Sequence, residues 1–285
     1  MKTPSFVLAA LLLAATTAQA QSFAAVSGQP LGVAQATGRP AATRPYATRH
    51  LAGGGSLTYF EAVPTCDARH EQFAQLRQAF ADSKPTLVLY QWPDMGFDST
   101  ETATIARLGT SGYLRFLTHQ LGGVPTQRFA DPLAEYAHLQ ASTAAEPLKL
   151  YYLLQQASRF RASTGAGKAA VQRAMQALLE RSAAFLPGTG QVIRTLPELE
   201  AAYRRYCPAG GQWWELPASF FTPDAPAGQT GPALAAINQA LGDYRTQQLQ
   251  RLATEQARAG QRVLVVAAPG YLPAALSQAG PVARR

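Results

Sequence analysis

Three acidic residues follow a short apolar run, at a place where carboxylates can act as general acids, general bases or metal ligands. The run is Thr86–Tyr90, and the acids are Asp94, Asp98 and Glu101. Acidic side chains beside the start of a helix more often cap the helix or interact with its dipole. We therefore interpret the three residues as capping and dipole partners, with acid–base chemistry as the alternative.

The other residue types that carry chemistry show no familiar spacing. The chain has four histidines, and none has a His, Asp or Glu partner at the spacing of a metal site. No Gly-x-Ser-x-Gly nucleophile motif occurs. The segment Ser163–Lys168 resembles a phosphate-binding loop, but Ala162 and Ala169 replace its first glycine and its hydroxyl residue. The sequence predicts no metal and no cofactor, and we assign no catalytic residue.

Residues 1–20 have the pattern of a signal peptide. Lys2 precedes an apolar segment, Phe6–Ala15, that is too short to span a bilayer, and Ala18-Gln19-Ala20 fits a cleavage site. No later apolar run approaches the roughly 20 residues of a transmembrane helix. We expect an exported, periplasmic or extracellular protein that is cleaved after Ala20 and has no transmembrane segment.

Two cysteines, Cys66 and Cys207, lie far apart in the sequence. Exported proteins fold where disulfides form, so an even number of cysteines is compatible with one bridge. Two buried free thiols are the alternative. We expect Cys66 in a loop after the first strand and Cys207 in an exposed turn at the end of a helix.

The formal net charge is +8, and the arginines that carry it are scattered along the chain. No basic cluster is interleaved with aromatic residues, which argues against nucleic-acid binding. The charge is compatible with weak contact with an anionic envelope surface, although a solvated mixed surface explains it more simply.

Apolar spacing predicts strands at both ends of a long helical region. Residues 21–52 are rich in Ala, Gly, Pro and Thr and predict a disordered arm. A strand at Ser56–Val63, a helix at His70–Asp82 and a strand at Thr86–Tyr90 form a β-α-β unit, which predicts a parallel strand pair. Further helices are expected at Thr102–Leu108, Gly112–Leu121, Pro132–Gln140, Pro147–Phe160, Ala169–Leu186 and Pro197–Tyr206.

A helix and a strand close the ordered part of the chain. Ala235–Gln256 has helical spacing, and Val263–Ala268 is apolar on both faces, as central parallel strands are. Ligands of open α/β sheets bind beyond the carboxyl ends of such strands. Here that place holds Pro269–Pro273, without a His, Asp, Glu, Cys or Lys. We predict one α/β domain over residues 53–278 with a mainly parallel sheet, a large helical insertion at about 100–206, and a tail at 279–285.

The order of these elements resembles the erythromycin-esterase-like and TraB/TIKI-like superfamily of hydrolases. Ser56–Phe80 is similar to its opening strand, loop and helix, and Lys84–Tyr90 with Pro93 is similar to its second strand. Ile237–Leu276 is similar to its closing helix and strand. The resemblance implies a pocket at the strand ends, where His and Glu side chains bind a metal ion that activates water.

The residues at those positions depart from the family pattern. Pro64, Gln91, Gln248 and Tyr271 stand where the resemblance places metal-binding or other polar groups. Proline has no ligand atom in its side chain, and neutral amides are poor metal ligands. The resemblance therefore implies a degenerate pocket, lined by Asp67, Gln91, Arg245, Gln248 and Tyr271.

Three functions are compatible with this pattern. The first is an exported, non-catalytic pseudoenzyme whose pocket binds a small polar or anionic ligand or serves the structure. The second is an active hydrolase in which Asp67, Asp94 or Glu101 acts with Arg245. The third is an envelope interaction protein that uses its basic face and the loop around Trp213 and Trp214. Convergence of Asp67, Gln91, Arg245 and Tyr271 in one cleft would favour the first two functions.

Overall fold

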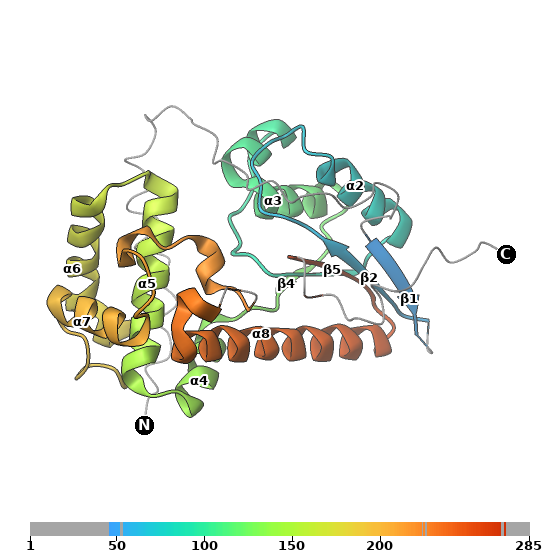
Figure 1. Ribbon diagram of the computed structural model, residues 1–285. Helices are drawn as coiled ribbons and strands as arrows, with labels where there is room; N and C mark the ends of the chain where they lie inside the picture. The colour runs from blue at the N-terminus through green and yellow to red at the C-terminus, as the bar shows by residue number, and fades with distance from the viewer. Residues whose placement is uncertain (1–45, 52–53, 224, 226, 269–270, 272–285) are drawn as a thin grey trace, which may run out of the picture. The chain divides into compact units, whose positions relative to one another are not determined.

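A five-stranded sheet with helices on both faces forms the core of one of two units in the computed structural model (Figure 1). The structure describes residues 46–271 except 52–53, 224, 226 and 269–270. The sheet unit comprises the described residues up to Glu135 and from Asp243 onward, and the helical unit comprises Tyr136–Gly242. The predicted signal peptide, most of the predicted arm and the tail at 279–285 lie outside the described residues.

The sheet is mainly parallel, as the sequence predicts. Its strands are β1 (Tyr46–His50), β2 (Ser56–Glu61), β3 (Leu87–Tyr90), β4 (Thr126–Arg128) and β5 (Arg262–Ala267), in the order β1-β2-β5-β3-β4. Only the β1–β2 pair is antiparallel among these strands. The β2 and β3 strands are parallel but not adjacent, because β5 lies between them. The central place suits β5, whose residues after Arg262 are all buried.

Alternating side chains of the central strands pack on opposite faces of the sheet. Leu264 and Val266 face α2 (Gln72–Ser83) and α3 (Glu101–Gln120), together with Phe60 of β2. Val263 and Val265 face the second half of α8 (Ala227–Arg258), where Leu249, Ala253 and Ala257 are fully buried at helical spacing. Figure 1 shows α2 and α3 on one side of the sheet and α8 on the other.

Two edge strands are missing from the sequence prediction. The β1 strand lies inside the predicted disordered arm, so that prediction is wrong for residues 46–50. Its Tyr46 ring stacks on Phe60, with 6.4 Å between ring centroids, and its hydroxyl donates to Asp82 at 2.6 Å. The β4 strand has three residues and pairs only with β3. Such short polar strands are stabilised by their neighbours, and their own sequence pattern is weak.

A glycine divides α3 where the sequence predicts two helices. Gly109 has φ 60° and ψ −151°, outside the helical region. A Cβ atom at this position would lie 2.8 Å from the backbone oxygen of Thr65. The kink therefore lets α3 approach the loop that follows β2, which no larger residue would permit.

The helical unit packs around α5 (Ala145–Thr164). Its other helices are α4 (Pro132–Ser142), which begins in the sheet unit, α6 (Lys168–Phe185), α7 (Leu196–Tyr206) and the first half of α8. The 3₁₀ turns η1 (Trp213–Glu215) and η2 (Ala218–Phe221) place Trp213 and Phe220 in its core. Within the described residues, no helix is long and apolar enough to span a membrane.

The boundaries of the helical unit differ from those of the predicted insertion at about 100–206. The α3 helix belongs to the sheet unit, because its buried Ile105, Tyr113 and Leu117 pack in the core beneath the sheet. The helical unit instead extends to Gly242, because Leu234, Ile237 and Leu241 of α8 join its core.

Candidate functional site at the carboxyl end of the sheet

Gln91 links the carboxyl ends of two neighbouring strands. It directly follows β3, and its side-chain Oε1 accepts a hydrogen bond from the backbone N–H of Ala268 at 3.0 Å, just after β5. Its backbone oxygen accepts from Nε of Arg128 on β4 at 3.3 Å. The neutral amide thus extends the pairing of β3 with β5 beyond the last backbone hydrogen bonds.

Arg245 of α8 forms a bidentate ion pair with Glu135 in the first turn of α4. Nε of Arg245 lies 2.7 Å from Oε1 of Glu135, and Nη2 lies 2.7 Å from Oε2. The side chains are only 20% and 6% exposed. Planar guanidinium and carboxylate groups match in this geometry, and such bonds are among the strongest in proteins. Both oxygens of Glu135 are therefore bonded to the guanidinium.

The electrostatics of this pair favour the charged arginine. Burial opposes the charged form of Arg245, but the hydrogen bonds and negative charge of Glu135 outweigh it, with a further hydrogen bond to Tyr271. The net effect raises the pKa of Arg245 above its ordinary value. Tyr271 also packs beside Phe129, with 6.1 Å between ring centroids. Arg245 and Tyr271 thus meet at the carboxyl end of the sheet.

Arg128 is the cation at this edge that sequence analysis missed. It lies on β4 opposite Tyr90 and is partly buried. Burial lowers the pKa of Arg128, an effect that the charge of Glu135 partly offsets and the charge of Arg245 reinforces. No carboxylate of the described residues lies within ion-pair distance of Arg128. The signal for it in the sequence is weak, because β4 is too short to be recognised.

Asp67 and Gln248 do not join this group. Asp67 lies in an exposed loop, where its Oδ1 accepts from the backbone N–H of Arg69 at 3.0 Å. That bond, with the nearby charge of Arg69, lowers the pKa of Asp67. Gln248 accepts from Arg251 at 2.9 Å. The predicted five-residue lining therefore separates into one group, Gln91, Arg245 and Tyr271, and two residues with other local partners.

The acidic residues after β3 are each paired with an arginine. Asp94 lies 3.2 Å from Nε of Arg115, Asp98 lies 3.1 Å from Arg107, and Glu101 pairs with Arg77. Glu101 occupies the first turn of α3, and Thr100 is its N-cap, accepting from the backbone N–H of Ala103 at 3.2 Å. Glu101 therefore lies where it can interact with the helix dipole, whereas Asp94 and Asp98 lie before α3 and the capping side chain is Thr100.

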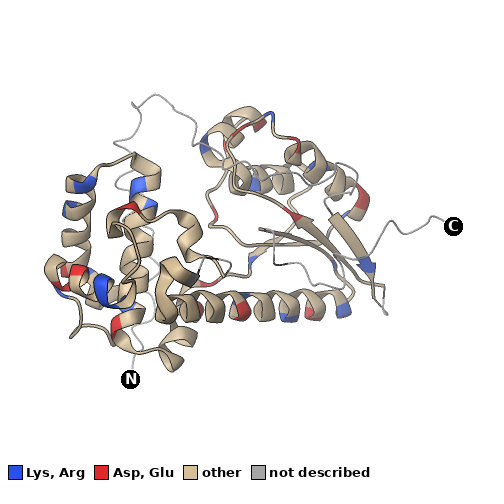
Figure 2. Ribbon diagram, viewed as in Figure 1, with Lys and Arg blue, Asp and Glu red and all other residues tan. Residues whose placement is uncertain are grey.

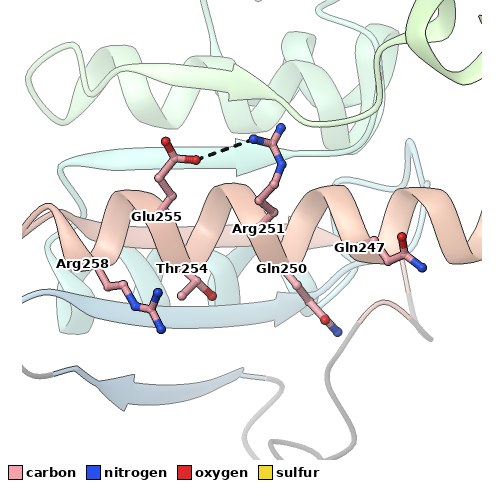
Figure 3. Close-up of a pocket in the computed structure, with 6 residues that line it drawn as sticks. All are labelled: Gln247, Gln250, Arg251, Thr254, Glu255 and Arg258. Carbon is pink, nitrogen blue, oxygen red and sulfur yellow. Dashed lines mark ion pairs between the residues drawn. The ribbon is translucent and has the colours of Figure 1, made fainter.

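A shallow depression lies along the outer face of α8, and none of its lining residues belongs to the group just described (Figure 3). Arg251 and Glu255 form its single ion pair among the residues drawn, at 3.8 Å and with both side chains 63% exposed. Exposed pairs of this kind contribute little. The lining consists of polar and charged side chains, namely Gln247, Gln250, Arg251, Thr254, Glu255 and Arg258.

The two cysteines are free thiols in different environments. Cys66 is exposed in the sheet unit, and Cys207 is 2% exposed in the core of the helical unit. The expectation that Cys207 lies in an exposed turn is wrong, because its thiol points inward and donates to the backbone oxygen of Thr230 at 3.3 Å. Burial raises the pKa of Cys207 to about 11.

In the view of Figure 2, Lys and Arg alternate with Asp and Glu along the helices and form no continuous basic stripe. Across the part of the chain that the structure describes, no three His, Cys, Asp or Glu side chains are grouped to hold a metal ion.

Comparisons with known proteins give no relative from which a function could be transferred. No protein-family model matches the chain, and no curated protein or solved structure matches it significantly.

Proposed function

We propose that this chain is an exported, non-catalytic member of the hydrolase group it resembles, and that the edge formed by Gln91, Arg128, Arg245 and Tyr271 binds a small polar or anionic ligand. The bidentate pair between Arg245 and Glu135 is the observation that carries this proposal. It occupies the end of the sheet where the resemblance implies a metal site.

The ion pair occupies the carboxylate and guanidinium groups that a hydrolytic centre would need to have free. A hydrolytic centre needs a carboxylate that can take a proton from water or attack the substrate. Both oxygens of Glu135 bond to Arg245, and Arg245 also bonds to Tyr271. At the neighbouring strand end, the Gln91 side chain is bonded to Ala268. These contacts support a structural and binding role for the edge.

The two alternatives have less support. The acids proposed for a relocated hydrolase, Asp67, Asp94 and Glu101, pair with three different arginines, and none of them pairs with Arg245. For an envelope interaction protein, the tryptophan loop would have to be available. Trp213 is 3% exposed, and Lys168 lies 4.2 Å from the ring centroid of Trp214.

Metal content and turnover test the proposal together. The mature protein, with Gln21 as its expected first residue, should retain no stoichiometric zinc, manganese or iron after dialysis against metal-free buffer. It should also hydrolyse no ester, amide or peptide substrate of a broad panel. One equivalent of tightly held metal would contradict the proposal. So would turnover that Asp94→Asn or Glu101→Gln abolishes, because that result establishes the relocated hydrolase.

A further inference from the structure

Arg128 differs from Arg245, the other partly buried arginine at the carboxyl edge, because no described carboxylate forms an ion pair with it. Arg245 lies between Glu135 and Tyr271. Arg128 donates from Nε to the backbone oxygen of Gln91, and its two terminal nitrogens donate to no other described residue. A partly desolvated guanidinium without an anion is energetically unfavourable, as its lowered pKa indicates.

The neighbouring carboxylates are committed elsewhere. Both oxygens of Glu135 bond to Arg245. Oδ1 of Asp131 accepts from the backbone N–H of Leu133 at 3.1 Å, at the start of α4. The charges of Glu135 and Asp131 act on Arg128 from a distance, and the charge of Arg245 opposes them. Neither carboxylate forms an ion pair with Arg128, so its terminal nitrogens keep their donors for another acceptor.

From this geometry we infer that Arg128 is the binding residue for a small oxyanion, a carboxylate or a phosphate, at the carboxyl end of β4. The Nε bond to Gln91 leaves the two terminal nitrogens of Arg128 for a ligand. The terminal nitrogens of a guanidinium can donate two parallel hydrogen bonds to two oxygens of one oxyanion. The edge of a mainly parallel sheet is also where ligands of such folds bind. The inference deepens the proposed function and rests on it, since it names the ligand class of the same edge.

Replacing a ligand-binding arginine and replacing a purely structural arginine should change the stability of the ligand-free protein in different ways. If Arg128 binds an anion, its unpaired charge destabilises the ligand-free protein. Replacing Arg128 should then abolish binding and leave the stability of the ligand-free protein unchanged or raise it. Binding residues commonly show this opposition between stability and function. If Arg128 mainly holds Gln91 in place, replacing it should lower stability.

Sodium acetate and sodium phosphate are the probes, each replacing sodium chloride at constant ionic strength so that screening stays the same. We expect saturable binding of at least one probe to the full-length mature protein by calorimetry. Arg128→Gln should weaken it by about tenfold to a hundredfold, the usual effect of losing charged hydrogen bonds. The control is Arg107→Gln, which removes an exposed arginine of the same unit and should leave binding unchanged. The stronger probe identifies the ligand as carboxylate or phosphate.

Amide NMR of the unaltered protein gives a second readout in case Arg128→Gln does not fold. Saturable shifts should centre on Gln91 and on Gln127–Phe129. The inference is overturned if neither probe saturates, if shifts lie elsewhere, if Arg128→Gln binds as well as the unaltered protein, or if the folded variant is clearly less stable without ligand. Those failures leave the non-catalytic proposal standing, whereas metal or turnover would overturn that proposal irrespective of anion binding.

Discussion

Each unit of this protein contains a buried or largely buried cationic side chain. The two units differ in the groups that replace the water around its charge. In the helical unit, Lys149 is 1% exposed and donates to the backbone oxygens of Val192 at 2.8 Å and Thr189 at 3.3 Å. In the sheet unit, Arg245 is 20% exposed and meets a carboxylate with two bonds of 2.7 Å. One charge is solvated by dipoles, and the other is neutralised by an opposite charge.

The pKa values of the two side chains move in opposite directions. Burial lowers the pKa of Lys149, with Glu198 offsetting and Arg194 reinforcing the effect. The pKa of Arg245 is raised, because its pairing with Glu135 outweighs burial. Carbonyl dipoles therefore replace only part of the hydration that Lys149 loses, whereas a carboxylate more than replaces that of Arg245. The comparison predicts that the sheet unit depends on its pair more strongly than the helical unit depends on its lysine.

The largest expected effect is that of Glu135→Gln. This substitution keeps the size of the side chain but leaves the Arg245 charge buried without its partner. We expect the free energy of unfolding of the sheet unit to fall by about 3–5 kcal/mol. Urea denaturation should be followed by amide exchange, which reports the two units separately. Glu146→Gln is the matched control, because its pair with Arg205 is more exposed and should contribute at most about 1 kcal/mol.

A double substitution sharpens this test. Combining Glu135→Leu with Arg245→Met removes both charges and should recover much of the lost stability, as uncharged replacements of buried pairs often do. If Glu135→Gln costs no more than the Glu146→Gln control, the sheet unit does not depend on its ion pair and the comparison fails.

Lys149→Met should have an intermediate effect. It leaves the carbonyls of Thr189 and Val192 without their donor, at a cost of about 1–3 kcal/mol, and it removes a desolvated charge, which partly offsets that cost. We expect the helical unit to lose about 1–2 kcal/mol, less than the sheet unit loses with Glu135→Gln.

The pH dependence of stability tests whether burial destabilises the charged form of Lys149. In the folded protein the pKa of Lys149 is lowered from 10.5, so the unfolded chain binds more protons between the lowered value and 10.5. The stability of the unaltered protein should therefore rise with pH through that window, relative to Lys149→Met. Parallel stability curves for the two proteins would show that Lys149 carries no desolvation penalty.

Helix caps offer a pair of smaller, matched effects. Thr100 caps α3 in the sheet unit, and Thr195 caps α7 in the helical unit by accepting from the backbone N–H of Glu198 at 3.3 Å. Thr100→Ala and Thr195→Ala should each cost about 1 kcal/mol, and the corresponding serine variants much less. The loss should appear in amide exchange of the unit that holds the substituted cap. A loss spread equally over both units would show that they unfold as one.

The smallest expected effect concerns the two cysteines, whose thiols should differ in reactivity. Replacing the exposed Cys66 should leave the free energy of unfolding unchanged. In native protein one thiol, Cys66, should react with a thiol reagent, and Cys207 should react only after unfolding, because it is buried and its pKa is raised to about 11. Cys66→Ser should abolish the native reaction. Unfolded, unreduced protein without titratable thiols would establish the disulfide that the even number of cysteines allows.

The sequence by itself determined the elements with strong apolar periodicity. The spacing in β5, α2 and the second half of α8 predicts their positions, and the predicted helices Thr102–Leu108 and Gly112–Leu121 correspond to the two halves of α3. These segments bury a continuous face, so a repeated pattern of apolar residues records their structure. The resemblance to a known family, and no spacing in the sequence, implies that Asp67, Gln91, Arg245, Gln248 and Tyr271 line one pocket.

Only the tertiary structure decided which partners those residues meet. Glu135 is far from Arg245 in the sequence, and nothing in its surroundings distinguishes it from a residue of an exposed first turn. Arg128 lies on a three-residue strand that is stable only beside β3, and β1 likewise needs β2. Ion pairs and edge strands depend on groups brought together by the fold, and they leave no periodic signal because their energy comes from the partner.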